Sequence, residues 1–527
     1  VILAVIMVAF PWWYTPQPVA FMLDAVGPPQ VPGYAQSGDD RLVMTGSSRL
    51  PETLDPALLR DAESSFIARQ VFRGLVKLDN DLIARPDLAS AIDVSGDGLT
   101  YTFQLKENAV FHDGTPIDAQ AVADSLNRAA DPELAGGDGF ALPAAIYLND
   151  IEGAEDRLAG AASTISGIDV LDGQALQIRL SRPSASFLYQ LTGNPASVVD
   201  VSETDNEGWW REPNGSGPFE MEVMDESEIV LDGFDDFYDG APALGGASIL
   251  FGSRAAQPLN LYEREVVDIA EVPFYAIERV SSPSDPLNAD LVVQPQLSTT
   301  YVAMNPNVEP FDDPAVRRAV AQALDREKIV RVMFADAVTR ADGLVPAGIL
   351  DREWPSQPLP YDLDAAQTAA SMAEPSVAPP AFYGGINVTI QQILERDLGI
   401  EAQAIGLDWS EFSSRLQDQS LPAFSLTWIA DFPDPAIFLD ALFHSRSPDN
   451  YIGYSNPDVD RLLDDAAVEH DPEVRANLYL QAQQMIIDDA VLVPLYHDVS
   501  YTLVNQRVSG LTITPIGILS LEDVQLR

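Results

Sequence analysis

Apolar and polar positions alternate along this chain with two different periods, and the period changes several times. Residues 99–105 carry an apolar side chain at every second position, which predicts a strand with one buried face. Residues 64–75 instead carry apolar side chains at helical spacing, which predicts an amphipathic helix. The mixture of strands and helices along the chain predicts an α/β protein.

Proline and polar turn residues mark where several of the elements begin and end. Asp313 and Pro314 predict a cap for a helix over residues 315–324, because proline is favoured in the first helical turn. Two short apolar runs, at 221–224 and 228–231, flank a polar turn and predict a hairpin. The other predicted elements are strands at 41–46, 174–180 and 491–495, helices at 118–128, 458–469 and 472–490, and a loop at 372–380.

The length and composition favour a globular protein of more than one lobe. A single hydrophobic core rarely grows beyond about 250–300 residues, and this chain has 527. Because 46% of its residues are hydrophobic, it can bury a core and is not a disordered chain. We therefore expect two or three lobes.

The charge is strongly one-sided, with 80 acidic against 30 basic residues and a net charge of −50. We expect no nucleic-acid binding, because it requires basic patches that neutralise phosphates. Only three lysines occur, Lys77, Lys106 and Lys328. Adaptation to a salty environment and codon drift combined with an ordinary acidic surface explain this composition equally well.

The absence of cysteine and the apolar first segment bear on location. Without cysteine the chain can carry no disulfide and no lipid-modified cysteine anchor. Residues 1–10 are wholly apolar, which fits the core of a signal segment, and Gly33-Tyr34-Ala35 offers a cleavage site before Gln36. We expect export by a cleaved signal peptide, to the periplasm or the outer face of the membrane. The alternative is an uncleaved N-terminal anchor.

One segment, Ser-Leu-Thr-Trp-Ile-Ala-Asp-Phe-Pro-Asp-Pro at residues 425–435, combines a strand with a rigid turn. Trp428 supplies a broad apolar surface and Asp431 a fixed negative charge, the pairing that a pocket for an extended amine-bearing ligand needs. A strand that ends in Asp-Pro is also an ordinary capped turn. Both interpretations stay open on the segment alone.

The wider chain resembles the family 5 solute-binding proteins, the peptide-binding receptors of bacterial ABC importers. The 425–435 segment resembles the family pattern W-x-A-D-[YF]-x-[DE]-P. Five further matches occur in family order, so the resemblance spans roughly residues 40 to 512. They are Leu54-Asp55-Pro56, residues 97–105 with 111–116, Gly215-Ser216-Gly217-Pro218-Phe219, residues 310–314 with 316–319, and Val493-Pro494-Leu495-Tyr496.

The resemblance implies a two-lobed periplasmic-binding-protein fold of the large peptide-binding type, with an extra subdomain on the first lobe. Two chain crossings would join the lobes, and a ligand would bind between them. The expected divisions are a signal or anchor segment with linker at 1–39, the first lobe at 40–78, 195–293 and 490–527, the extra subdomain at 79–194, and the second lobe at 294–489.

The resemblance also implies where a peptide would bind. Asp431 would pair with its α-ammonium group, and Trp428 would wall the first side-chain pocket. The main chain at Ile429 and Ala430 would pair with the peptide backbone as an added strand. On the other side the same pairing is expected from Arg49, Leu50 and Pro51, although Pro51 lacks a donor.

Three residues near the expected crossings are further candidates for the binding site. Tyr301 lies on the strand that leads into the second lobe, and Tyr496 and His497 lie near the return. Each fits ordinary interface packing equally well.

No arrangement of residues supports catalysis, so we expect a receptor and not an enzyme. His112 and Asp113 are interpreted as part of a structural turn, and the four histidines show no metal-binding spacing. We expect no metal, no cofactor, a monomer, and partners consisting of an oligopeptide and the permease subunits. The alternatives are a metal chelate, haem or oligosaccharide ligand, or a secreted hydrolase. A carboxylate-binding arginine opposite Asp431 would distinguish among the ligands, and Arg415 is a candidate whose position the sequence leaves open.

Overall fold

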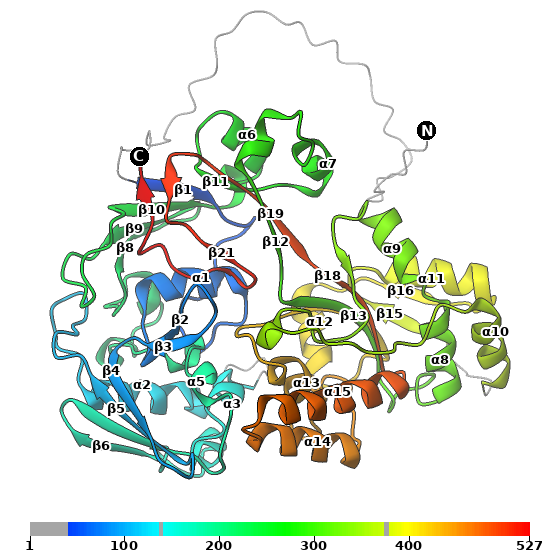
Figure 1. Cartoon of the computed structure of the whole chain (residues 1–527), viewed down its shortest axis with the longest axis horizontal. Helices are drawn as coiled ribbons and strands as arrows, with labels where there is room; N and C mark the ends of the chain where they lie inside the picture. The colour runs from blue at the N-terminus through cyan, green and yellow to red at the C-terminus, as the bar shows by residue number, and fades with distance from the viewer. Residues whose placement is uncertain (1–40, 136–140, 374–378) are drawn as a thin grey trace, which may run out of the picture. The chain divides into compact units, whose positions relative to one another are not determined.

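The computed structural model describes residues 41–135, 141–373 and 379–527. The expected signal or anchor segment, residues 1–39, lies outside this described part. Two large mixed sheets and one smaller antiparallel sheet organise the described residues (Figure 1). Each large sheet forms the centre of one lobe, so the two-lobed α/β fold expected from the sequence is confirmed. In this described part no helix is long and apolar enough to cross a membrane.

The first lobe is built on a seven-stranded sheet with a parallel centre. Strand β1 pairs in parallel with both of its neighbours, and Leu42 on β1 is fully buried. The strands lie in the order β12 (Leu291–Pro295), β19 (Val499–Val504), β11 (Ile269–Glu271), β1 (Arg41–Thr45), β10 (Gly246–Leu250), β9 (Glu228–Gly233) and β8 (Phe219–Met224).

Helix α1 (Ala62–Val71) packs against this sheet and carries Arg69. It begins because Asp61 accepts a hydrogen bond from the Ser64 amide at 2.8 Å, which satisfies a free N–H of the first turn. Ile67 and Val71 enter the core of the first lobe. The other elements of this lobe are α6 (Pro258–Glu263), α7 (Ile277–Val280), β20 (Val508–Ser509), β21 (Ile513–Thr514), β22 (Gly517–Ile518) and β23 (Gln525–Leu526).

The extra subdomain is a four-stranded antiparallel sheet covered by short helices. Its order is β4 (Ala89–Val94), β5 (Thr100–Leu105), β7 (Ala175–Arg179) and β6 (Ile168–Asp172). Tyr101, Phe103 and Leu105 of β5 are buried, as their alternation predicts. The surrounding elements are β2 (Val76–Leu78), β3 (Ala84–Pro86), α2 (Ala119–Ala129), α3 (Ala144–Tyr147), α4 (Ala154–Leu158) and α5 (Phe187–Gln190).

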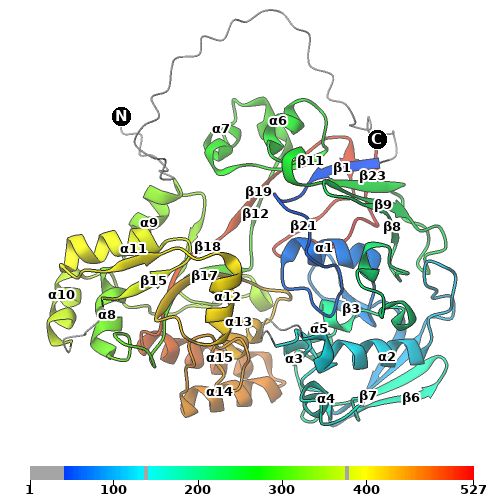
Figure 2. The ribbon, with the colours of Figure 1, turned by 180° about the vertical axis from the view of Figure 1, so that it is seen from behind.

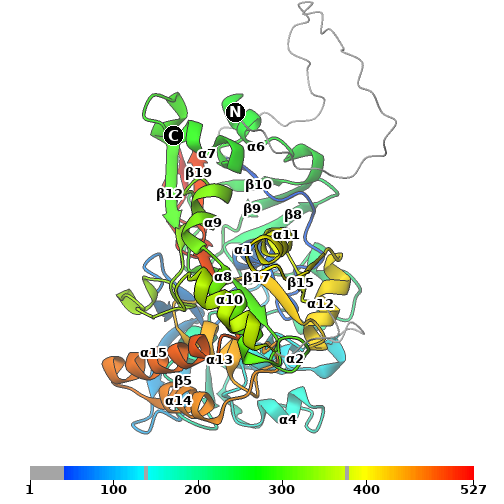
Figure 3. The same cartoon turned by 90° about the vertical axis from the view of Figure 1, so that its right-hand side faces the viewer.

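The second lobe is built on a six-stranded sheet in the order β14 (Thr339–Arg340), β18 (Leu492–His497), β13 (Ser298–Met304), β17 (Ala423–Ile429), β15 (Ala381–Tyr383) and β16 (Gln403–Ile405). Every residue of β13 is buried, because helices cover the sheet. Helices α14 and α15 pack on each other (Figure 3). The helices are α8 (Pro314–Ala323), α9 (Arg326–Met333), α10 (Leu363–Met372), α11 (Asn387–Ile393), α12 (Trp409–Gln417), α13 (Ala436–Phe443), α14 (Pro457–Val468) and α15 (Pro472–Asp488).

The chain passes between the two large sheets at two adjacent points (Figure 2). The first crossing lies between β12 and β13, and the second is Asp498, between β18 and β19. The amide of Gln296 donates to the Asp498 carbonyl at 2.9 Å, and the Ser298 hydroxyl donates to the Asp498 carboxylate at 3.0 Å. The two crossing segments therefore form one hydrogen-bonded pair, the arrangement expected of a two-strand hinge.

One expected boundary is corrected by the strand pairing. Sequence placed residues 490–527 in the first lobe, but β18 pairs with β13 in the six-stranded sheet. The chain returns to the first lobe only at Asp498, because the whole buried strand is needed to complete the second sheet. The predicted strands and helices otherwise occur within a few residues of their expected bounds, except that part of the 372–380 loop lies outside the described residues.

Candidate functional site

The turn after β17 sends two aspartates in different directions. Asp434 is 1% exposed and accepts two hydrogen bonds from the Arg475 guanidinium, at 2.7 and 2.8 Å. It also accepts from the amide of Ala436, the first residue of α13, at 2.9 Å. This second Asp of the motif is therefore a structural residue that joins the turn to α15.

Asp431 instead faces the first lobe and its extra subdomain. Its carboxylate accepts a hydrogen bond from the hydroxyl of Tyr147, which ends helix α3, 284 residues away in the chain. Arg69 of α1 also interacts with it electrostatically. Burial raises the pKa of the Asp431 carboxyl above its usual value, while the Tyr147 hydrogen bond and the Arg69 charge counteract this rise. The site thus holds a carboxylate that is incompletely compensated.

Aromatic rings surround the contact between the Asp431 turn and the extra subdomain. Phe432 is 2% exposed and packs edge-on against Tyr147, with ring centroids 6.4 Å apart. It also stacks with Tyr189 at a centroid distance of 6.2 Å. These apolar contacts limit the access of water, which strengthens electrostatic interactions at Asp431.

A second acid of the second lobe, Asp449, lies in the same electrostatic environment. Burial raises the pKa of its carboxyl, the Tyr451 hydroxyl donates to it at 2.9 Å, and the charge of Asp431 raises that pKa further. Arg60 of the first lobe counteracts this rise. Two carboxylates of the second lobe, Asp431 and Asp449, are therefore opposed by two arginines of the first lobe, Arg60 and Arg69.

Trp428 and its neighbours occupy the end of β17 as the sequence predicts. The Trp428 indole donates to the Ile437 carbonyl at 2.7 Å, and its ring packs on the core while remaining partly exposed. Ile429 is 42% exposed, and the amide of Ala430 donates to the Leu297 carbonyl. Ala430 therefore already has a backbone partner for its N–H.

One edge of β17 is nevertheless open near its end. Strand β15 pairs with β17 only at Ala423 and Phe424, and no other strand of the described residues pairs with that edge. Because Ala430 bonds toward β13, the alternation of an antiparallel ladder turns the backbone groups of Thr427 and Ile429 toward the open edge. This edge could accept an added strand.

The expected partners in the first lobe, Arg49, Leu50 and Pro51, lie in the loop after β1. Arg49 is exposed, and its carbonyl accepts from the Ser47 hydroxyl at 2.8 Å. Leu50 is partly buried against the core of the first lobe, and Pro51 is buried. Pairing of this loop with a ligand backbone stays a prediction.

The three candidates near the crossings are integrated into the second sheet. Tyr301 is 2% exposed on β13, and Tyr496 is 8% exposed and packs on Phe334 with centroids 4.5 Å apart. His497 has its Nδ1 within 2.9 Å of both the Thr299 hydroxyl and the Ser298 carbonyl, and burial lowers its pKa. Of the three, only Tyr301 is coupled to the site, through the charge of Asp449.

The other histidine and arginine candidates have structural roles. His112 lies between the backbone groups of Gly215 and Gly217, at 3.2 and 3.0 Å, and burial lowers its pKa to about 4. It therefore links the two motifs as a neutral side chain. Arg415 pairs with Glu411 on the exposed side of α12. No group of three or more metal-ligating side chains occurs within residues 41–135, 141–373 and 379–527.

The sequence marks Asp431 as a candidate but gives no sign of the residues that the structure places around it, Arg69, Tyr147 and Asp449. Arg69 reads as an ordinary helix position, and Tyr147 belongs to a four-residue helix that no motif marks. A signal for them was absent because their proximity to Asp431 arises only when distant segments fold together.

The hinge, the two mixed sheets and the carboxylate between them define a two-lobed binding protein. The chain matches the description of bacterial extracellular solute-binding proteins, family 5, middle region, over residues 84–373, which is more than half of its length. The chain therefore belongs to the family 5 extracellular solute-binding proteins, the binding components of bacterial ABC importers.

Full-length similarity to characterised proteins agrees with this assignment. The chain is 27% identical to the glutathione-binding protein GsiB of Salmonella paratyphi A over 519 residues, covering 94% of this chain and 96% of that protein. The murein tripeptide binding protein MppA of Escherichia coli has the same fold, with a TM-score of 0.81, 22% identity and coverage of 92% and 98%. Haemophilus influenzae OppA in complex with the peptide RPPGFSPFR gives a TM-score of 0.80, with 20% identity and coverage of 92% and 99%.

Proposed function

We propose that this protein is an exported, monomeric receptor that captures oligopeptides between its two lobes and delivers them to the permease of an ABC importer. The observation that carries the proposal is Asp431, a carboxylate whose pKa burial raises and whose hydrogen-bonding partner is the neutral hydroxyl of Tyr147. An uncompensated buried carboxylate is costly, and a ligand ammonium group would remove that cost. The α-ammonium of a peptide is such a group.

Capture would proceed by rotation about the paired crossings. Opening the lobes breaks the hydrogen bond between Tyr147 and Asp431 while the Ser298–Asp498 pair stays within the hinge. An entering ammonium would then share or replace the Tyr147 hydrogen bond as the lobes close. Binding energy would stabilise the closed state and drive no bond cleavage, so we expect no turnover.

The backbone of a bound peptide has a matching place on the same strand. The open edge of β17 at Thr427 and Ile429 leads directly to Asp431, so a strand added there would place its first residue at the carboxylate. Backbone pairing explains how such a receptor tolerates varied side chains. The names of the relatives, which include a glutathione-binding and a murein tripeptide binding protein, support short peptides as ligands.

Native mass spectrometry of the purified protein tests the proposal directly. We expect peptides of a few residues to be released on denaturation, and we expect them to compete with added peptides in calorimetry. A bound sugar, haem or metal chelate in their place would contradict the oligopeptide assignment. Turnover of peptides or glycosides by the purified protein would contradict the receptor assignment.

A further inference from the structure

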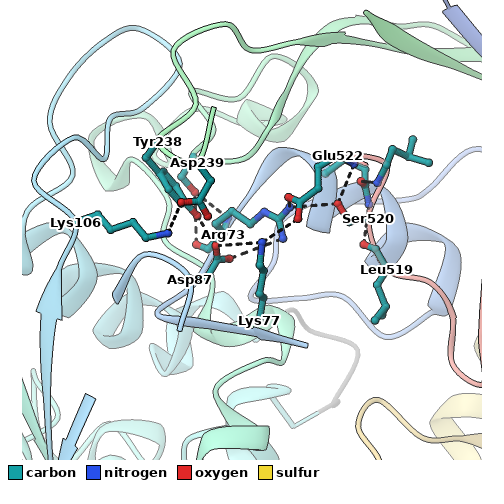
Figure 4. A network of polar contacts seen from close by, with 12 residues as sticks. Arg73, Lys77, Asp87, Lys106, Tyr238, Asp239, Leu519, Ser520 and Glu522 are labelled. Atoms are coloured by element: carbon teal, nitrogen blue, oxygen red, sulfur yellow. Dashed lines mark hydrogen bonds and ion pairs between the residues drawn. The ribbon is translucent and has the colours of Figure 1, made fainter. Parts of the chain in front are cut away.

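The extra subdomain is fixed to the rest of the first lobe by a cluster of charged and polar side chains. Arg73, just after α1, lies 3.8 Å from Asp87 of the subdomain, and the Tyr238 hydroxyl donates to Asp87 at 2.6 Å (Figure 4). In the same cluster Lys106 of the subdomain donates to Asp239 at 2.6 Å. Because these contacts join segments of one lobe, we expect the subdomain to move with the first lobe as one body when the lobes rotate.

The same subdomain also contacts helix α14 of the second lobe. The Arg182 guanidinium, in the segment after β7, donates to the Asp464 carboxylate at 2.9 Å. Three residues further along, the amide of Ala185 donates to the Ala467 carbonyl at 3.1 Å. Ala467 lies in the last turn of α14, where carbonyl groups have no partner within the helix, so this bond between the lobes satisfies one of them.

The turn between β4 and β5 extends this contact. A Cβ atom added at Gly98 would lie 3.5 Å from the imidazole of His470, just after α14, and 3.7 Å from the Cβ of Pro183. Two separate segments of the subdomain therefore lie against the end of one second-lobe helix. We call this the subdomain–α14 contact, and it consists of Gly98, Arg182 and Ala185 with Asp464, Ala467 and His470.

Arg182 lies between two carboxylates that belong to different lobes. Its Nε is 3.5 Å from Asp150 of the subdomain, and its Nη1 bonds Asp464 of α14. Arg446 of the second lobe also donates to Asp464, at 2.9 Å. Without Arg182, Asp150 and Asp464 would face each other across the lobe boundary as like charges. Arg182 therefore attracts the second lobe and also neutralises a repulsion that favours opening.

The subdomain–α14 contact is connected to the candidate site by one short segment. Tyr147, whose hydroxyl bonds Asp431, lies three residues before Asp150. The hinge rotation that joins Tyr147 to Asp431 would therefore form the subdomain–α14 contact as well. Because the closed state holds the ligand, a contact between the lobes that stabilises this state raises the affinity without itself binding the ligand.

We propose that the extra subdomain is a latch of this receptor: the subdomain–α14 contact stabilises the closed state, and ionic strength sets how strongly it does so. This inference rests on the proposed capture by lobe closure. The side chains of Arg182 and Asp464 are 39% and 42% exposed, so mobile ions reach the pair and screen it. The receptor therefore holds its ligand more tightly in dilute than in salty surroundings.

Distances between spin labels in the ligand-free protein test the latch without any ligand. The chain has no cysteine, so Asp156→Cys on α4 of the subdomain and Asp488→Cys on α15 of the second lobe place one label on each side of the boundary. We expect Arg182→Gln, and independently Asp464→Asn, to increase the population of longer distances at low ionic strength. Thermal unfolding of each variant verifies that it is folded.

Calorimetry with the probe peptide Ala-Ala-Ala measures the effect on binding. At low salt we expect Arg182→Gln to weaken binding about fivefold, which corresponds to the upper range of a partly exposed ion pair. The difference from wild type should vanish at about 1 M salt, where charges are screened within about 3 Å. The double variant with Asp464→Asn should bind about as weakly as Arg182→Gln alone. The matched control is Arg179→Gln, which should leave the affinity unchanged, because Arg179 is equally exposed and pairs with Glu152 and Asp169 of its own subdomain.

The remaining outcomes each contradict a specific statement. An unchanged affinity in Arg182→Gln at low salt overturns the latch and leaves peptide binding intact. Losses that add up in the double variant, or a loss that persists at high salt, show that Arg182 does not act through its pair with Asp464 and likewise overturn the latch. Absence of Ala-Ala-Ala binding by the wild type, together with absence of released peptides in native mass spectrometry, overturns the proposed function itself, and the label distances then decide the latch alone.

Discussion

Two aspartates three residues apart on the same turn, Asp434 and Asp431, have opposite surroundings. Asp434 is held by both nitrogens of Arg475, a residue of the same lobe, and by the first amide of α13. Asp431 has the neutral hydroxyl of Tyr147, and the opposing charge that acts on it is that of Arg69 in the other lobe. Asp434, which serves the fold, is compensated within its own lobe, whereas Asp431, the proposed binding residue, is not.

The same contrast separates two arginines of the first lobe, Arg69 on α1 and Arg73 just after it. Arg73 bonds Glu522 at 2.6 Å and lies 3.8 Å from Asp87, which connects the C-terminal segment and the extra subdomain to the segment after α1. Arg69 has no such partner among the described residues. Charge pairing therefore separates Asp434 and Arg73 from Asp431 and Arg69 more clearly than burial does, because all four side chains are largely enclosed.

The largest expected effect concerns the structural aspartate. Asp434→Ala removes the carboxylate that accepts two hydrogen bonds from the buried Arg475 guanidinium, so we expect the free energy of unfolding to fall by about 3–5 kcal/mol in a denaturant titration. Asp458→Ala is the matched control, because its partner Arg461 is exposed and such pairs contribute about 0–1 kcal/mol. A loss below about 1 kcal/mol for Asp434→Ala would contradict the structural role of Asp434.

A second acid, Asp440, lies near Arg475, and one arginine cannot compensate two carboxylates. Burial raises the pKa of Asp440 to about 7, although the Tyr479 hydroxyl and Arg475 lower it. A folded-state pKa above the usual value means that stability falls as pH rises from about 4 to 7. We therefore expect Asp440→Asn to stabilise the protein relative to wild type by about 3 kcal/mol more at pH 8 than at pH 4.5.

Thermal unfolding across this pH range measures the effect, and Asp465→Asn on exposed α14 serves as control. A difference between Asp440→Asn and wild type that stays constant with pH would show that Asp440 is ionised throughout. That outcome would show that Arg475 compensates the charges of both Asp434 and Asp440.

Asp431, the proposed binding residue, should affect ligand affinity and not stability. Asp431→Asn removes the charge that a ligand ammonium needs, so we expect amine-bearing peptides to bind more than tenfold more weakly, while N-acetylated peptides lose little. Stability should stay within about 0.5 kcal/mol of wild type, because relief of the buried charge offsets the lost attraction to Arg69. Calorimetry with matched free and acetylated peptides measures the difference, and equal losses for both would assign Asp431 a structural role.

The sequence predicted the local parts of this molecule well. Strand β5 and helix α8 follow directly from alternation and from the Asp313-Pro314 cap, because their determinants lie within a few residues. The Trp-Asp segment likewise gave Asp431 as the candidate. The sequence did not separate Asp431 from Asp434 by environment, since that depends on Arg475 and Tyr147, which lie far away along the chain.

The sequence misplaced the lobe boundary at β18 and gave no signal for Arg69, and both have the same cause. A buried strand such as β18 can complete either sheet, and only its pairing with β13 decides which. Arg69 and Arg73 lie one helical turn apart in sequence and look equivalent there. Their difference arises from what the C-terminal segment and the second lobe bring to each guanidinium.

The smallest expected effect is the pH dependence of ligand affinity. The groups that face Asp431 are Tyr147, Arg69 and Asp449, and burial places its pKa above the usual value of 3.8. A ligand ammonium needs the ionised carboxylate, so affinity should be full above that raised pKa and fall as pH decreases through it. Between about pH 7.5 and pH 5 we expect a loss of a few-fold in calorimetry. Asp431→Asn should show a flat profile over the same range, because the titrating group is gone. An unchanged slope in that variant would show that Asp449, and not Asp431, is the titrating group. The proposed difference between Asp431 and Asp434 would then be wrong.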